Sequence, residues 1–419
     1  MKRIIKKMAK ILGSLVIGLC LGLLAFLMFQ MYKPVMDASK PIEEIGVYAH
    51  AVTDELMNRD VKIIGLGEAT HGNKEFQEIK LDVLKTLVRD NGVSALCFEM
   101  DYGEGVLINE YIQGKSDMTS EELFSHISFG IYHTEEMKEL IEWMREYNAD
   151  LRDGCLEFYG FDIQNPEVDI YVIHEFAKAR NMTISSEAID AFLRNEFSFR
   201  DDRMNEVFET LSTFREKLMS AEDHDSTEVY RIVKCIDNVF LAKELAAIPA
   251  ADGTGYGTYR DKAMADNCLE ISDHVGYPIM LAGHNGHVGY AGSYVKTTGS
   301  YLKEVLGDDY FVIGTDYFKT TASIKAENGR KNHTFYSGDP LAYQAKKLGT
   351  YYLRFEDLKD NEKLNSIITN KMPTGSLGES YSILNHLMAA SVRVYAPPTD
   401  MFDAMVFVYE ATPFTMLND

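Results

Sequence analysis

Residues 61–72, VKIIGLGEATHG, decide the fold. They open with a mostly apolar run that is too short for a globular helix and ends in glycine, which predicts a buried strand. Residues just past the carboxyl end of a strand in a parallel α/β sheet line the ligand crevice. We therefore expect Glu68 and His71, which follow this run, to lie in a functional site.

A second stretch of the same kind is found at residues 277–287, YPIMLAGHNGH. Tyr277 to Gly283 predicts another buried strand, and His284, Asn285 and His287 follow it. Two strand ends that carry a carboxylate and three histidines between them predict one composite catalytic site. The two segments lie far apart in the chain, so the fold must bring them together.

Other apolar runs predict further strands, and each of the next three also ends near an acidic side chain. These strands are expected at residues 94–99, before Asp101, at 156–163, which includes Asp162 and precedes Gln164, and at 310–315, before Asp316. Two more are expected at 351–355 and 404–409. Helical apolar spacing fills most of the intervals, including a leading helix at 42–58. This alternation predicts an α/β fold with a mainly parallel central sheet flanked by helices.

Residues 185–250 show helical apolar spacing and no strand pattern. We interpret them as a large helical insertion that caps the site. The glycine-rich residues 251–257 end this insertion and match neither the P-loop nor the dinucleotide pattern, so they are expected to form a flexible loop.

The N-terminus predicts a membrane anchor. Residues 1–10 are basic, and residues 11–30 are uncharged and long enough to span a bilayer as a helix. The flanking cations predict a cytoplasmic N-terminus, so the expected protein is single-pass with its catalytic domain extracytoplasmic. Residues 31–42 are expected to be a tether and 43–419 the catalytic domain. A cleaved signal peptide is the alternative, although no Ala-x-Ala-like site follows the run.

Composition narrows the possible partners. The chain of 419 residues has a formal net charge of -22, which argues against nucleic acid and anionic lipid, because both bind basic surfaces. Its five cysteines show no Cys-x-x-Cys spacing, so neither a disulfide scaffold nor a zinc–thiolate site is indicated. No Gly-x-Ser-x-Gly motif is present, which excludes the common serine-hydrolase arrangement.

The strand ends supply Glu68, His71, Glu99, His284 and His287 for chemistry. Two histidines three residues apart, together with carboxylates, could bind a metal ion for hydrolysis. The same residues also suit metal-free catalysis, in which one histidine is the base, carboxylates orient it, and another histidine stabilises an oxyanion. The residues alone do not separate these two hypotheses.

Several motifs, in order, resemble the erythromycin esterase family. They are Gly67 to Gly72 with Glu75, Phe76 and the basic residue at 80; residues 98–101; residues 108–112 with Gly114; residues 160–164; Arg260, Asp261, Met264, Ala265 and Asn267; and His284, Asn285 and His287. The resemblance extends from about residue 43 to 415. It implies a metal-independent hydrolase, without a cofactor, that acts on esters and is best known for opening macrolide lactones.

The resemblance also implies roles for individual residues. His71 would activate water, and Glu68 and Glu99 would hold the water or the histidine. His284 and His287 would lie across the cleft and either stabilise the transition state or assist proton transfer. Lys80 stands where the family usually has arginine; lysine keeps the charge but lacks the planar fork. The substrate is expected to contact Lys80, Asp162, Gln164, Asn285 and Arg260.

The predicted function is therefore a membrane-anchored, extracytoplasmic esterase whose partner is a small-molecule ester, either a macrolide lactone, as in antibiotic resistance, or another acyl ester. Three alternatives stay open: a metal-dependent hydrolase, a non-enzymatic ligand- or haem-binding relative, and an enzyme that modifies cell-surface polysaccharide. The sequence makes no prediction of the oligomeric state.

Overall fold

A computed structural model describes residues 2–57, 59–150, 155–182, 184, 187–249, 251–276, 278–292 and 295–417. Its centre is an eight-stranded sheet with the order β3-β2-β4-β1-β5-β10-β7, in which β6 pairs with β5. The strands are β1 (Ile63–Glu68), β2 (Ala95–Asp101), β3 (Glu157–Asp162), β4 (Ile279–His284), β5 (Tyr310–Ala326), β6 (Gly329–Tyr336), β7 (Tyr351–Arg354) and β10 (Ala404–Ala411).

The strands from β3 to β10 along this order are parallel, and only β7 and β6 pair antiparallel to their neighbours. Every residue of β1, β2 and β4 is buried, because helices cover both faces of a parallel sheet. This burial explains why the strands read as continuous apolar runs. The predicted mainly parallel α/β fold is confirmed; Tyr277, the predicted first residue of β4, lies outside the described residues.

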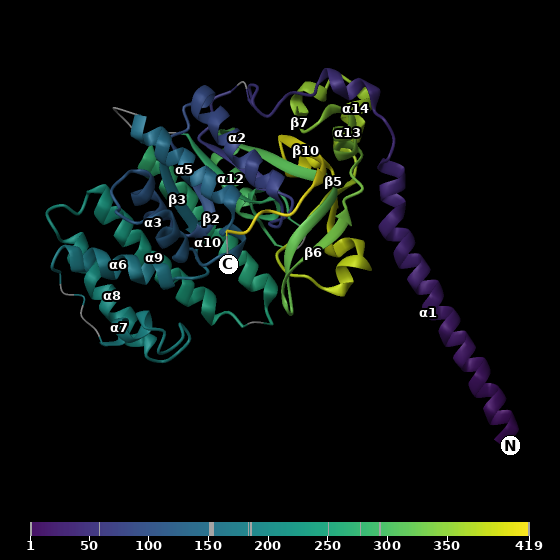
Figure 1. The fold of residues 1–419 in the computed structure, drawn as a ribbon, viewed down its shortest axis with the longest axis horizontal. Coiled ribbons are helices and arrows are strands. Elements are labelled where there is room, and N and C mark those ends of the chain that lie inside the picture. Colours follow the sequence, from purple (N-terminus) through teal and green to yellow (C-terminus); the bar gives the residue numbers. More distant parts are fainter. Residues whose placement is uncertain are drawn as a thin grey trace.

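Helices surround the sheet (Figure 1). They are α2 (Lys74–Asn91), α3 (Tyr102–Ile112), α4 (Ser120–Ser125), α5 (Glu135–Asp150), α6 (Glu167–Ala179), α7 (Glu187–Leu193), α8 (Met204–Met219), α9 (Thr227–Ala247), α10 (Gly253–Val275), α11 (Asn285–Val288), α12 (Thr298–Leu306), α13 (Pro340–Leu348), α14 (Glu362–Thr369) and α15 (Pro398–Met401).

The predicted helical insertion consists of α7, α8 and α9, while its predicted limits, residues 185 and 250, lie outside the described residues. These helices gather with α6 beside the β3 edge of the sheet (Figure 1). The insertion reaches the end of β3, because Nδ2 of Asn238 on α9 donates a hydrogen bond to the backbone oxygen of Asp162. Its role as a cap stays a prediction.

Two local predictions are wrong. Residues 42–57 form only a short 3-10 turn, Glu43–Val47, because their backbone bonds to the body: His50 exchanges two hydrogen bonds with Tyr352. The glycine-rich segment is the start of α10 rather than a loop, since Asp252 caps this helix by accepting the N–H of Gly255. Three strands were also missed: β6 and the separate pair β8 (Met372–Gly375) and β9 (Arg393–Ala396).

Helix α1 (Lys2–Ala38) projects from the body as a single rod (Figure 1). From Lys6 to Ala38 it is long and apolar enough to cross a membrane, a test that signal sequences also pass. The helix continues through most of the predicted tether, because its last turns pack on the body. Met31 and Ala38 are buried there, and Leu27 and Val35 are partly buried, a spacing that places all four on one helix face.

Candidate active site

The parallel register brings the two histidine motifs together. Glu68, the last residue of β1, lies directly beside His284, the last residue of β4. Strand β2 flanks β4 on its other side and contributes Glu99 close to its own end. The carboxyl ends of three neighbouring strands therefore form one site, at the edge of the sheet where α/β proteins bind ligands.

Glu68 holds His71 and Lys80, one with each carboxylate oxygen. Its Oε1 lies 2.6 Å from Nδ1 of His71, and its Oε2 accepts a 2.6 Å hydrogen bond from Nζ of Lys80. Lys80 also donates to Oε1 of Gln77 at 3.0 Å, and its ammonium lies 4.8 Å from the centre of the Phe98 ring. Because Glu68 accepts from Nδ1, neutral His71 carries its proton there and keeps a lone pair on Nε2.

His284 has the opposite arrangement. Its Nδ1 accepts the N–H of Gly286 at 3.1 Å, so the proton of the neutral ring is on Nε2. Within the described residues this Nε2 is buried without a hydrogen-bond partner. The rings of His284 and His71 lie with centroids 4.9 Å apart. A ring with a free base nitrogen thus lies beside a ring with a free N–H donor.

Glu99 and Arg260 form the other half of the site. Oε2 of Glu99 accepts the backbone N–H of His284 at 2.7 Å, and its Oε1 accepts from Nη2 of Arg260 at 2.9 Å. Arg260, on α10, also binds Asp162 with Nε and Nη2, and donates from Nη1 to Nε2 of His287 at 3.0 Å. On its other side His287 donates from Nδ1 to Asp261 at 2.9 Å.

Electrostatics separate the protonation states of these groups. Burial favours a raised pKa for Glu68, but Lys80 and His71 outweigh it and hold that pKa at about 2. Burial also favours a raised pKa for Glu99, but the charges of His287 and Arg260 outweigh it and hold that pKa well below the usual range. Both carboxylates are therefore ionised at neutral pH.

The three histidines differ among themselves. Burial favours a lowered pKa for His71, but the hydrogen bond and charge of Glu68 outweigh it and raise the pKa above 6.5. The pKa of His287 is also raised, because the charge of Glu99 outweighs burial. Burial and the neighbouring His71 lower the pKa of His284 to about 3, so this ring stays neutral. A titrating base thus lies beside a permanently neutral donor.

Tight backbone contacts fix the strand ends. A Cβ at Gly67 would come 2.1 Å from Oδ1 of Asn285, so only glycine fits there. Asn285 itself spans the gap to β5: its Nδ2 donates to the backbone oxygen of Thr315 at 2.8 Å, and its Oδ1 accepts the N–H of Thr315. These contacts explain why the GEATHG and GHNGH segments must meet closely.

All ten predicted site residues gather at or beneath this edge, and they differ in exposure. Lys80, Asp162 and Asn285 are only 1%, 0% and 6% exposed and bond to neighbouring protein groups, so their contact with a substrate stays a prediction. Gln164 is partly exposed and joins Asp162 to Tyr256 through hydrogen bonds of 2.8 and 3.2 Å. Arg260 and Gln164 are the two predicted substrate contacts that are partly exposed.

Sequence reasoning missed two supporting residues. Asp261 orients His287 and accepts the N–H of Thr298 at 2.8 Å, and Gln77 supports Lys80. Asp261 adjoins Arg260 in the α10 motif that carries the family resemblance, which could have identified it. Gln77 gave no signal, since it is one polar residue on an amphipathic helix.

In the part of the chain that the structure describes, no group of three or more His, Cys, Asp or Glu side chains is arranged to hold a metal ion. His71, His284 and His287 instead have separate hydrogen-bond partners, and Arg260 lies between His287 and Asp162. The donor set therefore does not form the compact cage that zinc sites require.

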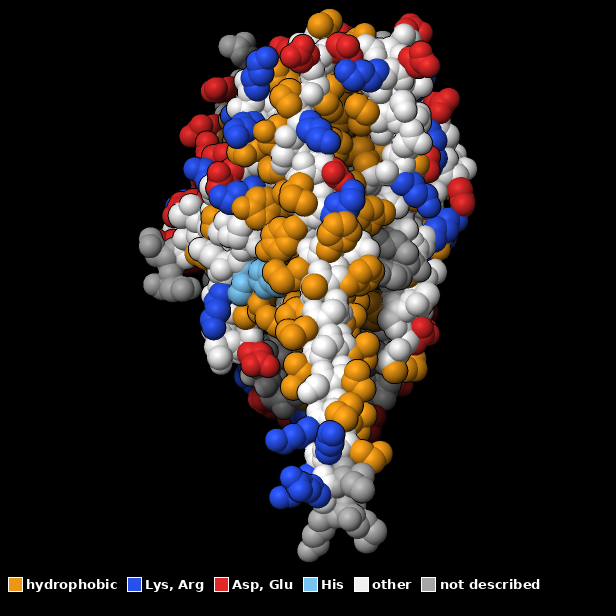
Figure 2. Space-filling view, turned by 90° about the vertical axis from the view of Figure 1, so that its right-hand side faces the viewer, with side chains coloured by type: hydrophobic (Ala, Val, Ile, Leu, Met, Phe, Trp, Pro, Cys, Tyr) orange, Lys and Arg blue, Asp and Glu red, His pale blue; other side chains and the backbone are white. Residues whose placement is uncertain are grey.

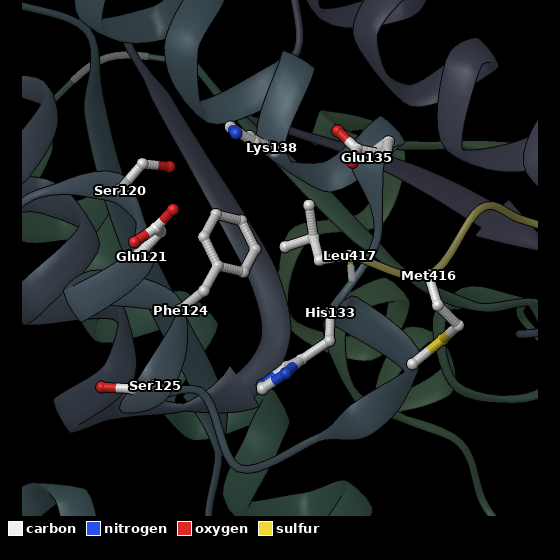
Figure 3. A pocket seen from close by; sticks show the side chains of 9 residues that line it. All are labelled: Ser120, Glu121, Phe124, Ser125, His133, Glu135, Lys138, Met416 and Leu417. Carbon is white, nitrogen blue, oxygen red and sulfur yellow. The ribbon is translucent and has the colours of Figure 1, made fainter. Parts of the chain in front are cut away.

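A surface cavity of about 440 Å³ lies away from these groups, between α4, α5 and the C-terminal tail (Figure 3). Phe124 and Leu417 face each other across it, and its one histidine, His133, is bonded through Nε2 to the backbone oxygen of Ile127. The cavity lacks the acid–base pairing of the strand ends. The tail beside it reaches the His71 loop, where Phe414 donates to the backbone oxygen of Gly72.

The fold and these strand ends define a class of α/β protein with a histidine–carboxylate site, and comparison with known proteins identifies the family. The profile described as erythromycin esterase matches residues 88–411, and the chain belongs to the erythromycin esterase family. Erythromycin esterase type II of Escherichia coli is 30% identical over 139 residues, which cover 32% of this chain and 32% of that protein. The family is one of ester hydrolases.

Solved structures share the fold. A Bacillus cereus protein superposes with a TM-score of 0.73 at 21% identity, covering 92% of this chain and 99% of that one. A mutant of the erythromycin esterase EreC in its open conformation has a TM-score of 0.57 at 15% identity, covering 88% of this chain and 94% of its own. At these identities the likeness establishes the common architecture.

Proposed function

We propose that this protein is a membrane-anchored, extracytoplasmic hydrolase in which His71 activates water to attack an ester. The observation that supports this most strongly is the pair of opposite nitrogens. Nε2 of His71 has a free lone pair, and Nε2–H of His284 is a buried donor without a partner among the described residues. An unsatisfied buried donor is costly, and an oxyanion in the transition state would satisfy it.

The reaction follows from this pair. A water molecule donates one hydrogen to Nε2 of His71 and attacks the ester carbonyl, while His71 takes the proton and Glu68 stabilises the resulting imidazolium. The carbonyl oxygen becomes an oxyanion that accepts the Nε2–H of His284. When the tetrahedral intermediate collapses, His71 returns the proton to the departing alkoxide. The products are a carboxylic acid and an alcohol, and no acyl-enzyme forms.

The remaining residues position this pair. Lys80 and Gln77 hold Glu68 from below, and Glu99 fixes the backbone of His284. Arg260, His287 and Asp261 form a chain of hydrogen bonds at the far side, where Arg260 and Gln164 can meet the substrate. Lys80 therefore acts as a positioning residue.

Membership of the family supports an ester as the proposed substrate. A macrolide lactone, which would confer antibiotic resistance, and an acyl ester of the cell surface both contain the bond that this site would hydrolyse. The proposed location is supported by α1, whose basic N-terminal residues favour the cytoplasm and whose apolar length suits one membrane crossing.

The test uses the full chain in detergent or lipid discs, with a macrolide and simple aryl and acyl-sugar esters as substrates. We expect turnover that resists chelator, and we expect His71→Asn to lose about a hundred- to ten-thousand-fold in kcat/KM with its fold intact. His174→Asn, on the partly exposed face of α6, is the matched control and should keep full activity. Hydrolysis that survives in folded His71→Asn would refute the role of His71, and turnover restored only by added metal would refute the metal-free reaction.

A further inference from the structure

The end of α1 is docked on the body through a small apolar cluster. Met31 packs there with Ala322, Ile324, Phe335, Leu377 and Val392. These residues come from β5, β6 and the segment between β8 and β9. The cluster fixes where the body sits relative to the helix.

Residues 380–392, which follow Leu377 and approach α1, are unusual for this chain. They include no Asp, Glu, Lys or Arg, although the whole chain has 64 acidic residues and a net charge of -22. Ile383, Leu384 and Met388 in this segment are 64%, 49% and 45% exposed. Exposed apolar side chains gathered in this way mark an interaction surface.

The position of this segment along α1 indicates what covers it. The uncharged run of α1 continues to Tyr32, before Lys33, and Met31 within it is already buried in the body. The short helical turn Ala389–Ser391 contacts α1 and belongs to the same segment. Residues 380–392 therefore lie at the level where α1 would leave the hydrocarbon of a bilayer.

The surface itself supports this placement. Figure 2 shows hydrophobic side chains along α1 and also on the face of the body seen around it, with histidine atoms beside them. The stacked rings of His333 and Tyr381, and of Phe335 and His386, form the base beneath the exposed segment. Aromatic rings and uncharged polar groups of this kind suit the headgroup region of a membrane.

We infer that residues 380–392 form a membrane-contacting surface, in which Ile383, Leu384 and Met388 enter the interface of the bilayer that α1 spans. The inference rests on the anchoring part of the proposed function. The occupant is the lipid surface, because the segment is continuous with the docked end of the anchor and carries no charge that opposes insertion. Shallow burial of apolar side chains at the headgroup boundary drives such contacts.

This contact would also set the distance of the catalytic loop from the membrane. The N–H of Leu377 donates to the backbone oxygen of Ala69 at 2.9 Å, and Ser323 donates to that of Gly72. Both bonds flank His71 in the loop after β1. Leu377 belongs to the cluster that holds Met31, and Ser323 lies between two other residues of that cluster, Ala322 and Ile324. The loop that carries His71 is therefore bonded directly to the residues on which α1 docks.

The test places a tryptophan on the surface of the full chain in phosphatidylcholine discs that hold one chain each. Leu384→Trp should lose emission when the lipids carry bromine on their acyl chains near the headgroup, and Met388→Trp is a second reporter. Val305→Trp, at a position 66% exposed on α12, is the matched control and should be unaffected. Native Trp143 supplies the same background in every sample.

Each outcome either supports or overturns contact of residues 380–392 with the membrane. Loss of emission in both reporters and not in the control supports membrane contact. Free access of a water-soluble quencher to Leu384→Trp overturns it, and so does protection from that quencher without bromolipid quenching, which would indicate a protein partner or a second copy. Ester hydrolysis and retention of the chain in the disc are measured on the same samples, so loss of activity with quenching intact refutes only the reaction.

Discussion

Replacing Lys80 by methionine removes the cation beneath Glu68 while filling nearly the same space. The Lys80 side chain is 1% exposed and Glu68 is 1% exposed, so the variant leaves a buried carboxylate whose remaining charge partner is His71. We expect Glu68 to respond by taking up a proton or by losing its hold on His71. Both responses weaken the folded state and the catalytic base.

Two arguments give the size of the stability loss expected for Lys80→Met. Lowering the pKa of Glu68 from 4.5 to about 2 corresponds to about 3 kcal/mol of stability at neutral pH, as an order of magnitude. Removing one partner of a buried ion pair typically costs about 3–5 kcal/mol. For a body of this length, 3 kcal/mol lowers the Tm by about 4 °C.

The assay is urea and thermal unfolding of Lys80→Met, Glu68→Gln and the double variant. We expect each single change to destabilise the protein by about 3 kcal/mol and the double variant to lose less than their sum, because it leaves no unpaired charge. Lys85→Met, at an exposed position on the same helix, is the control and should change stability by less than about 0.5 kcal/mol. Additive losses, or a Lys80→Met protein as stable as the control, would refute the ion pair as the support of Glu68.

The sign of the pH dependence can be checked in the same experiment. The lowered pKa of Glu68 gives stability that is present above pH 4.5 and is lost as the pH falls from there toward 2. Lys80→Met should therefore show a weaker dependence of stability on pH across this window. An unchanged acid-side slope would mean that another carboxylate causes it.

Two further predictions concern catalysis. His284→Phe should lower kcat by about a hundred- to a thousand-fold with little change in KM, because one oxyanion donor is worth about 3 kcal/mol; a variant that loses only substrate affinity would contradict the donor role. The kcat/KM of the native enzyme should fall as the pH falls through a value above 6.5, because His71 has a raised pKa and protonation removes its lone pair. His284, with a pKa of about 3, should not contribute to that limb, and a rate that rises on acidification would exclude His71 as the base.

The sequence predicted the centre of the fold well and its periphery poorly. Strands β1, β2 and β4 are buried on both faces, so their apolar composition predicts them without reference to neighbours. Strand β6 is mostly polar and exposed and has Gly329 at its start, a pattern that resembles a loop until its pairing with β5 is known. The expected helix at 42–58 failed for a similar reason, since its apolar residues are buried by contacts made far along the chain.

The site was predictable where chemistry follows a strand end and not where helices support it. Glu68, His71 and His284 were identifiable because they come directly after apolar runs. The burial of Lys80 beneath Glu68 could not be deduced, since its exposure depends on how α2 packs on the sheet. The role of Gln77 depends on the same packing. Periodicity identifies the buried face of a helix but not which buried polar groups bond to one another.

The order of the strands has a consequence for how activity appears. Strand β4 lies between β1 and β2, although it follows both by a long stretch of chain, and the bond from His284 to Glu99 joins residues 185 positions apart. Long-range pairing of this kind is a slow event in folding. Until β4 is inserted, the sheet does not link β1 to β2, so Glu68 and Glu99 are not yet held at one site. The proposed activity therefore requires that β4, the late strand in the sequence, has taken its place between them.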